Sequence, residues 1–302
     1  MIEASATSAA PAASTASSLR QVVSDYLELT KPKVQSLLLL TTITTMEVAG
    51  SPSVSRIALT CLGGYLSAGG AGAVNHYWDR DIDAQMSRTA TRPIPAGRIA
   101  PRTALIFGCA LSALSFALLS LTVNVLAASL ALGGFVGYVG VYTMWLKRRT
   151  PQNIVIGGAA GAIPPLVGWA ATTGSLSWTA VYLFAIVFYW TPPHFWALSL
   201  LMKGEYEKVG VPMMPVVRGE RETRKQILLY SLLLYAITQL PFCAGAFGGI
   251  YLVASMVLGF AFIGSAWLLY RRADRRSALR LYLFSLLYLA LLFAAMVIDI
   301  KL

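Results

Sequence analysis

Residues 75–83 read NHYWDRDID and lie at the end of a long apolar run that begins near residue 56. Within this stretch Asn75, Asp79 and Asp83 are spaced four apart, which places all three on one face of a helix. Like charges at this spacing repel, and carboxylates at the end of a membrane helix are costly unless something neutralises them. Mg²⁺ is usually held by one or two carboxylates plus substrate phosphates. The spacing therefore predicts a membrane enzyme that handles a diphosphate.

The composition supports the membrane assignment. Of 302 residues, 57% are hydrophobic and only 12% are charged, whereas soluble domains carry about 25% charged residues. We therefore expect an all-α polytopic membrane protein. The net charge of +11 does not indicate a nucleic-acid partner, because the basic residues gather in loops between apolar runs. Cys61, Cys109 and Cys243 lie inside such runs, which predicts free thiols and no disulfide framework or metal cluster.

Apolar runs long enough to cross a bilayer, about 17–25 residues, predict nine transmembrane helices. The runs are 35–50, 56–78, 103–121, 124–146, 154–173, 178–201, 227–246, 249–270 and 280–298. All 24 Lys and Arg residues except Arg56 and Lys301 precede the first run or lie in loops after the even-numbered runs. The positive-inside rule makes that side cytoplasmic, so we expect a cytoplasmic N-terminus, an external C-terminus and a cytoplasmic active site.

The first 18 residues are rich in Ala and Ser, a composition that cannot bury a core and predicts a disordered tail. The rest of the chain, 19–302, is then a single nine-helix domain. The tail lacks the continuous apolar core of a secretory signal, and it has no arginine before Arg20, unlike a mitochondrial transit peptide. These features favour a bacterial plasma (inner) membrane over the mitochondrial inner membrane.

The loop after the second run adds Arg88 and Arg92, which are also four residues apart. Guanidinium groups bind phosphate through a bidentate fork, so carboxylates and arginines together form a candidate diphosphate site. A simple set of salt bridges at the lipid headgroups is the alternative reading of the same residues. Lys147 and Arg148 follow the fourth run, where a basic cluster alone more often serves as an orientation signal.

The other long loop follows the sequence WTPPHFWAL at 190–198. Its diproline predicts a break or bend in the sixth run, which would place His194 and nearby aromatic rings against a cavity. His76 and His194 are the only two histidines, and each lies in or beside a long-loop motif. Either one could bind a ligand or simply form a hydrogen bond that holds helices together.

These motifs resemble the UbiA superfamily of intramembrane prenyltransferases. The N-x-x-x-D-x-x-x-D spacing at 75–83 is common to the superfamily, whereas the runs at 190–198 and GVPMMPVV at 210–217 resemble its haem O synthase (protohaem IX farnesyltransferase) branch. The similarity extends from about Leu27 to the C-terminus. The resemblance implies transfer of farnesyl from farnesyl diphosphate to a vinyl group of haem B with addition of water, giving haem O and diphosphate.

The resemblance also implies cofactors, partners and residue roles. Mg²⁺, as one or two ions, acts on the diphosphate; haem B is a substrate and not a permanent cofactor; a haem A synthase or a respiratory oxidase assembly is an implied partner. The implied metal ligands are Asn75, Asp79, Asp83 and Glu205. The implied catalytic residues are Asp79, Asp83, Arg88, Arg92 and Lys147. The implied substrate-binding residues are Asn75, Arg148, Lys203, His194, Tyr206, Trp196 and His76.

One departure leaves the number of metal ions open. Haem O synthases carry a Lys-Asp-Asp-Tyr-like run after the sixth span, whereas residues 203–206 here read KGEY. Gly204 supplies no carboxylate, so the available candidates are His194, Glu205 and Glu207. Three rival functions stay open at this point: a prenyltransferase acting on an aromatic or quinone precursor, a transporter, and a non-enzymatic assembly factor for a respiratory oxidase.

Overall fold

Helices make up the regular structure of residues 18–302, the part of the chain that the computed structural model describes. The predicted tail therefore lies, except for Ser18, outside the described residues. The helices are α1 (Leu19–Leu29), α2 (Pro32–Ala49), α3 (Val54–Trp78), α4 (Arg80–Gln85), α5 (Pro101–Thr122), α6 (Val125–Val136), the π-helix η1 (Gly137–Leu146), α7 (Asn153–Gly161), α8 (Ile163–Thr173), α9 (Trp178–Leu201), α10 (Lys203–Lys208), α11 (Met214–Val217), α12 (Gly219–Cys243), α13 (Gly249–Arg272) and α14 (Arg275–Lys301).

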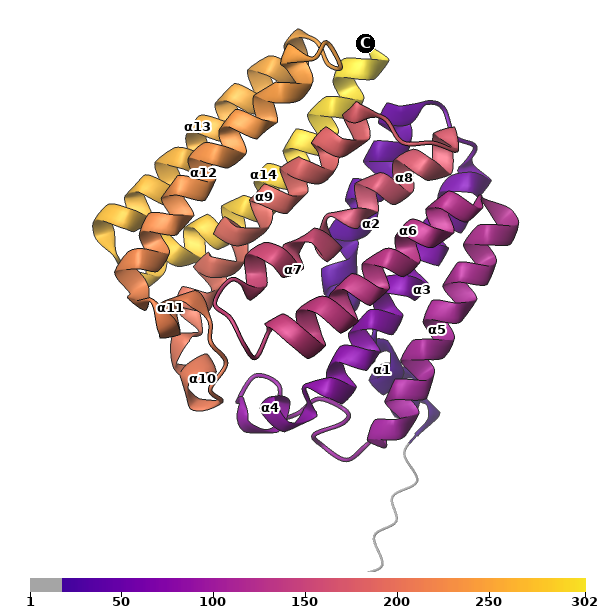
Figure 1. Cartoon of the computed structure of the whole chain (residues 1–302), viewed down its shortest axis with the longest axis vertical. Coiled ribbons are helices and arrows are strands. Elements are labelled where there is room, and N and C mark those ends of the chain that lie inside the picture. Colours follow the sequence, from indigo (N-terminus) through magenta and orange to yellow (C-terminus); the bar gives the residue numbers. More distant parts are fainter. Residues whose placement is uncertain (1–17) are drawn as a thin grey trace, which may run out of the picture.

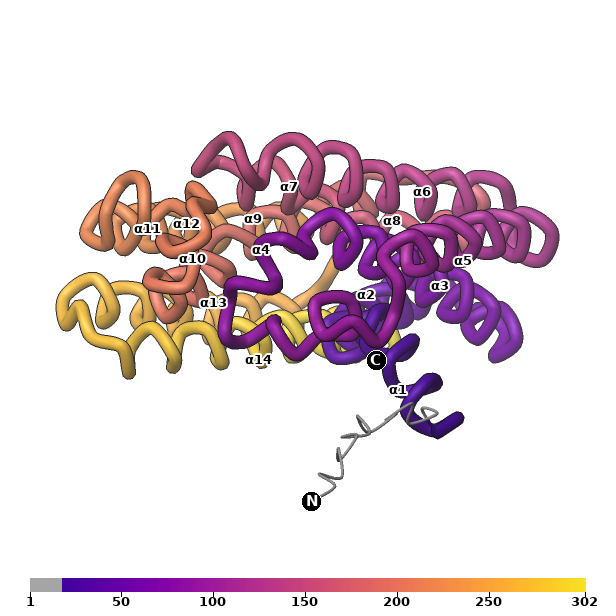
Figure 2. The backbone as a smooth tube through the Cα atoms, turned by 90° about the horizontal axis from the view of Figure 1, so that it is seen from below, coloured from indigo at the N-terminus to yellow at the C-terminus, as the bar shows by residue number. Residues whose placement is uncertain are grey.

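The long helices run side by side and form one bundle (Figure 1). The last helix, α14, packs against α13 and α9 and also against α2, so the two ends of the helical sequence meet and close the bundle. The short helices α4, α10 and α11 gather at the end of the bundle where α1 also lies (Figures 1 and 2). This end carries both long loops, as the spacing of the apolar runs predicted.

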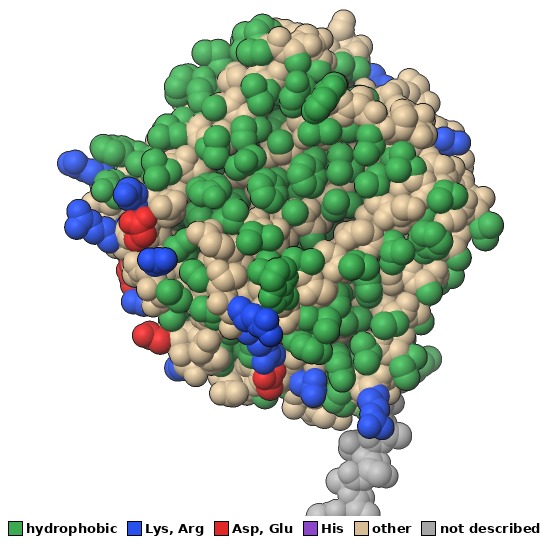
Figure 3. Space-filling view, in the orientation of Figure 1, with side chains coloured by type: hydrophobic (Ala, Val, Ile, Leu, Met, Phe, Trp, Pro, Cys, Tyr) green, Lys and Arg blue, Asp and Glu red, His purple; other side chains and the backbone are tan. Residues whose placement is uncertain are grey.

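Seven helical segments in the described part of the chain are long and apolar enough to cross a membrane. They are Val54–Trp78, Pro101–Thr122, Val125–Leu146, Asn153–Thr173, Gly219–Cys243, Gly249–Arg272 and Arg275–Lys301. They confirm a multi-pass membrane protein. Hydrophobic side chains cover much of the face in Figure 3, and most of its charged side chains lie along the end that carries the short helices. The two other predicted spans correspond to α2 and α9, so the count of nine and the orientation of the termini stay predictions.

The two diprolines have opposite effects on their helices. Pro164 and Pro165 lie in the first turn of α8, where proline costs little, and they separate α8 from α7. Pro192 and Pro193 lie inside α9, which stays helical without interruption. A break in the sixth span is therefore wrong, whereas the alternative, a bend, stays a prediction. Both rings are buried where α9 packs against its neighbours, and this packing offsets the two lost backbone hydrogen bonds.

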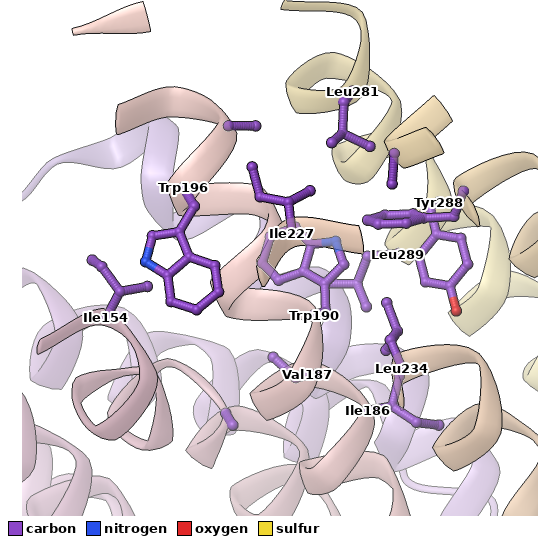
Figure 4. Packing of buried hydrophobic residues seen from close by; sticks show 14 of the residues in the cluster. Ile154, Ile186, Val187, Trp190, Trp196, Ile227, Leu234, Leu281, Tyr288 and Leu289 are labelled. Atoms are coloured by element: carbon purple, nitrogen blue, oxygen red, sulfur yellow. The ribbon is translucent and has the colours of Figure 1, made fainter. Parts of the chain in front are cut away.

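The largest hydrophobic core lies among α9, α12, α13 and α14 (Figure 4). Trp196, Tyr251, Tyr288 and Phe293 are fully buried there. The other half of the bundle uses small residues to bring helices together, as membrane helices commonly do. A Cβ atom at Gly70 of α3 would lie 2.5 Å from the carbonyl oxygen of Gly108 in α5, so these two backbones touch.

Candidate active site

Asn75, Asp79 and Asp83 form one face at the end of α3, as their spacing predicted. Asp79 ends α3 and precedes α4, yet its amide donates to the Asn75 carbonyl at 2.9 Å and its carbonyl accepts from the Asp83 amide at 2.8 Å. Helical hydrogen bonding therefore continues across the junction and keeps the three side chains aligned. All three are at most 4% exposed, so their polar groups need partners.

The Asn75 side chain orients the first carboxylate. Its Nδ2 donates to Asp79 Oδ2 at 2.7 Å and to Thr143 Oγ1 at 3.2 Å. Thr143 lies in η1 and is fully buried. π-Helical turns are rare and often occur at functional sites; this one brings the end of its segment to α3. These two bonds fix the amide group, whose oxygen Oδ1 accepts from a lysine described below.

Two cations from the segment after η1 pair with the carboxylates of α3 and α4. Lys147 Nζ donates to Asp79 Oδ2. The Arg148 guanidinium lies 2.7 Å from Asp81 and 3.5 Å from Asp79 Oδ1. The hydrogen bonds from Arg148 are the main cause that lowers the pKa of Asp81 to about 2. Asn75, Asp79 and Asp83 are called the acidic face below. Lys147 and Arg148 are more than an orientation signal, because both pair with Asp79 of this face.

Asp83 is held by the loop that follows it. Arg92 Nη1 lies 2.7 Å from Asp83 Oδ2, and the Thr89 hydroxyl donates to the Asp83 carbonyl oxygen at 2.9 Å. The salt bridge that the sequence left open as an alternative is therefore present for this pair. Arg88 is exposed and, among the described residues, has no hydrogen bond or ion pair.

Lys31 is a site residue that sequence reasoning missed. Its Nζ donates to Asn75 Oδ1 at 2.6 Å and lies 3.5 Å from the Tyr138 hydroxyl. Burial and the neighbouring charges of Arg92 and Lys147 lower the pKa of Lys31 to about 7. Its backbone has φ of 54°, a strained conformation for a residue with a Cβ and one that clusters at functional sites.

The oxygen atoms of this face fit a hard divalent cation. Asp79 Oδ1 is buried without a hydrogen-bond partner, and Asp79 Oδ2 and Asn75 Oδ1 each face a lysine ammonium group. A carboxamide and two carboxylates are oxygen ligands of the kind that Mg²⁺ takes. No group of three or more His, Cys, Asp or Glu residues within 18–302 is arranged to hold a metal ion. The candidate oxygen ligands at this face are thus the side chains of Asp79, Asp83 and Asn75.

Comparison with known proteins shows the family of this chain. The sequence model of the UbiA prenyltransferase family matches residues 37–293. The chain belongs to the UbiA prenyltransferase family. A protohaem IX farnesyltransferase of Symbiobacterium thermophilum is 56% identical over 284 residues, which are 93% of this chain and 95% of that protein. Another, of Chloroflexus aurantiacus, is 57% identical over 93% of this chain. This chain spans about half the length of that relative, 48%.

Solved structures of the family share the fold. A digeranylgeranylglyceryl phosphate synthase has a TM-score of 0.76 and 21% identity, covering 93% of this chain and 99% of that one. A UbiA homologue from Archaeoglobus fulgidus, solved with DMAPP and Mg²⁺, has a TM-score of 0.67 and 18% identity over 90% of this chain and 99% of that one. At identities this low, the similarity to these solved structures shows a shared fold alone.

In this UbiA family member, the predicted residues of the second long loop do not join the acidic face. The Lys203 ammonium group lies 3.3 Å from the carboxylate of Glu220. Glu205 accepts from the Ser87 amide at 2.8 Å, which brings the two long loops into contact. Tyr206 is half-buried against the large core.

The predicted aromatic and histidine residues lie within the helix packing of the family fold. The His194 ring stacks between Trp190 and Tyr282, with centroids 4.4 and 4.8 Å away, and its Nδ1 is 2.7 Å from Ser285 Oγ. Trp196 is buried in the same core (Figure 4). The His194 ring is thus packed between two aromatic rings, and its Nδ1 has a hydrogen-bond partner. Its role in substrate binding stays a prediction.

His76 differs from His194, because neither ring nitrogen has a hydrogen-bond partner although the residue is only 1% exposed. It lies one residue beyond Asn75 on α3. A buried imidazole without partners calls for an additional polar group, and His76 therefore remains a candidate for contact with substrate.

Proposed function

We propose that this chain transfers a farnesyl group from farnesyl diphosphate to a vinyl group of haem B with addition of water, giving haem O and diphosphate. The observation that carries the proposal is the meeting of a carboxamide and two buried carboxylates with cations from three other segments. The acceptor is inferred from the Symbiobacterium relative of nearly equal length, a protohaem IX farnesyltransferase.

The acidic face and its cations suit a diphosphate leaving group. Asn75, Asp79 and Asp83 would hold Mg²⁺, which when bound supplies Lewis-acid neutralisation of the diphosphate oxygens. Lys31 and Lys147 would then exchange their present oxygen partners for phosphate oxygens. Arg88 and Arg92 would add guanidinium donors, and Arg148 would keep Asp79 and Asp81 oriented. Fixed charge aimed at the departing group is the main catalytic effect expected here.

The bond changes require no protein nucleophile. The C1–O bond of farnesyl diphosphate breaks, and its electron pair leaves with the diphosphate. The terminal carbon of the haem vinyl group bonds to farnesyl C1, which leaves a cation on the carbon next to the porphyrin. Water adds to that carbon and loses a proton, giving a hydroxyl group. The apolar helix walls around the site delay capture of the farnesyl cation by water.

The proposal includes a topology and a location. Both α2 and α9 would cross the membrane beside the seven apolar segments, giving nine spans with the N-terminus and the site on the cytoplasmic side. The gathering of basic residues at the end with α4 and α10 supports this orientation. The membrane would be the bacterial plasma membrane, and the product would pass to a haem A synthase or a respiratory oxidase assembly.

The test uses membranes from an expressing strain, supplied with haem B, farnesyl diphosphate and Mg²⁺. Mass spectrometry should detect the farnesyl-hydroxyethyl adduct of haem, and the adduct should disappear in Asp79→Ala and in Asp83→Ala. A parallel reaction with 4-hydroxybenzoate separates the quinone-precursor alternative. An adduct on that acid alone, or haem adduct formation that survives both substitutions, would refute the proposal.

A further inference from the structure

The two long loops of this chain are joined by one side chain. The Oε2 atom of Glu205, in α10, accepts a hydrogen bond of 2.8 Å from the backbone amide of Ser87, and its other oxygen lies 3.5 Å from Lys208 Nζ. The two bonded residues are 118 positions apart in the sequence. Their contact is therefore a tertiary link between α10 and the segment after α4.

Apolar packing between the two loops supports this link. Ile82 and Met86 of the first loop are buried in the same core cluster as Val211, Met213 and Met214 of the second. Because both loops are seated in one core, the distance between Glu205 and Ser87 is set by packing as well as by the hydrogen bond.

The Ser87 amide belongs to a tight turn that contains Arg88 and that is also bonded to Asp83. The amides of Thr89 and Ala90 both donate to the Met86 carbonyl, at 3.0 and 2.9 Å, and the Thr89 hydroxyl donates to the Asp83 carbonyl at 2.9 Å. Arg88 lies between Ser87 and Thr89, so both of its chain neighbours are held. The position of the Arg88 backbone, from which its guanidinium group extends, therefore depends in part on the bond that Ser87 makes.

We propose that Glu205 is a positioning residue, which holds the turn carrying Arg88 beside the diphosphate site, and that it is not a metal ligand in this chain. The neighbouring Gly204 offers no carboxylate with which Glu205 could share an ion. Charge-assisted hydrogen bonds to a carboxylate are stronger than neutral ones, which suits a single link between loops. The role in diphosphate binding rests on the proposed function; the link itself does not.

Substitutions of Glu205 separate the two roles. Glu205→Gln keeps an oxygen that accepts from the Ser87 amide but removes the negative charge that a metal ligand needs; Glu205→Ala removes both. Glu207→Gln is the matched control, because Glu207 lies in the same short helix, is exposed, and its side chain has no hydrogen bond or ion pair with other described residues.

Hydrogen–deuterium exchange of the segment 86–90 gives a readout independent of catalysis. In Glu205→Ala we expect exchange to rise about tenfold, as the loss of one charge-assisted bond predicts. In Glu205→Gln and Glu207→Gln it should stay close to that of the unaltered protein. Exchange that is unchanged in Glu205→Ala would overturn the proposed link.

Kinetics complete the test. Glu205→Ala should raise KM for farnesyl diphosphate about tenfold. Glu205→Gln should have a KM close to that of the unaltered protein. The Mg²⁺ concentration for half-maximal rate should stay unchanged in both variants. A rise of that Mg²⁺ concentration in Glu205→Gln, with normal exchange, would make Glu205 a metal ligand and refute the proposal. If the unaltered protein forms no haem product, the proposed function fails, and the exchange results still decide whether the link exists.

Discussion

The residue with the closest cationic contact to the acidic face is Lys147, which pairs with Asp79 Oδ2. We expect Lys147→Gln to lower kcat about 10²-fold, because removal of one preorganised group that stabilises developing charge typically costs this much. Lys147→Arg should retain more activity. The measurement is kcat at saturating farnesyl diphosphate and Mg²⁺. Arg149→Gln is the control, because Arg149 is adjacent and exposed; equal losses in the two variants would contradict the assignment.

Thr143 acts on the face indirectly, through Asn75. Its hydroxyl accepts from Asn75 Nδ2 at 3.2 Å, and it is fully buried. Thr143→Val keeps the shape and removes the acceptor, so Asn75 Nδ2 loses one of its two hydrogen-bond acceptors. Loss of a group that orients a metal ligand commonly costs 10–100-fold in metal affinity. We expect the half-maximal Mg²⁺ concentration to rise by about tenfold with little change in KM for haem B; an unchanged Mg²⁺ dependence would refute this role.

At the residue scale the sequence predicted the acidic face but only part of its surroundings. Asn75, Asp79 and Asp83 follow from helical spacing alone, which is a local property. Lys31 meets Asn75 from 44 positions away, and such a contact depends on how helices pack, which spacing does not encode. The signal that the sequence offered was a lysine directly before Pro32, near the start of the first apolar run. His194 was singled out because histidine is rare here, yet rarity does not distinguish a ligand from a packed ring.

At the scale of elements, close contact of α3 and α5 depends on Gly70 and Gly108. A Cβ at Gly70 would meet the Gly108 carbonyl oxygen at 2.5 Å, and backbone cannot move aside as a side chain can. We expect Gly70→Ala to lower the free energy of unfolding by about 1–3 kcal/mol, the usual cost of overpacking. The measurement is reversible unfolding in detergent micelles.

Gly64→Ala is the matched control for Gly70→Ala. Gly64 lies on the same helix, and a Cβ there has no atom within 4 Å. Since Ala also favours helix over Gly, Gly64→Ala should be neutral or slightly stabilising. If the two variants unfold alike, the close approach of α3 and α5 does not limit stability.

Elements were predicted well where a long apolar run defines them and less well elsewhere. The helix α1 was missed because it is short and amphipathic, although Ser18 caps its first turn through the amide of Gln21. It is tied to the loop before α5 by Asp25, whose carboxylate is 2.9 Å from Arg98 Nε. The sixth span was expected to break or bend at its diproline, yet α9 stays helical through both prolines. Tertiary contacts decided both cases.

Polar contacts near the C-terminus tie α14 to α13 and to α2. Near the C-terminus, Asp299 accepts from the amides of Gly248 and Tyr251 at the start of α13, and Lys301 lies 3.0 Å from Glu47 at the end of α2. The opposite end carries the acidic face and the two long loops. Between these ends α2 packs against α3, α8 and α14, and α9 packs against α7, α8, α12 and α14. Several polar side chains of both helices are buried in these contacts.

The whole-molecule prediction is that α2 and α9 cross the membrane although their sequences are less apolar than the other spans. Membrane-impermeant maleimide added to intact spheroplasts should label Ser51→Cys and Ser175→Cys, which lie in exposed loops on the predicted external side. Lys33→Cys and Lys208→Cys should be labelled only after permeabilisation. The native cysteines, Cys61, Cys109 and Cys243, are first replaced by serine.

Each pair marks the two ends of one helix. Lys33 and Ser51 mark the ends of α2, and Ser175 and Lys208 mark the ends of α9. Opposite accessibility within a pair means that the helix crosses, whatever its hydropathy. Equal accessibility within either pair would contradict nine spans. Which member of each pair is labelled in intact spheroplasts decides the orientation. Labelling of Lys208→Cys from outside would place the acidic face on the external side, where farnesyl diphosphate made in the cytoplasm could not reach it. The cytoplasmic placement of the site therefore depends on the same four cysteines that test the number of spans.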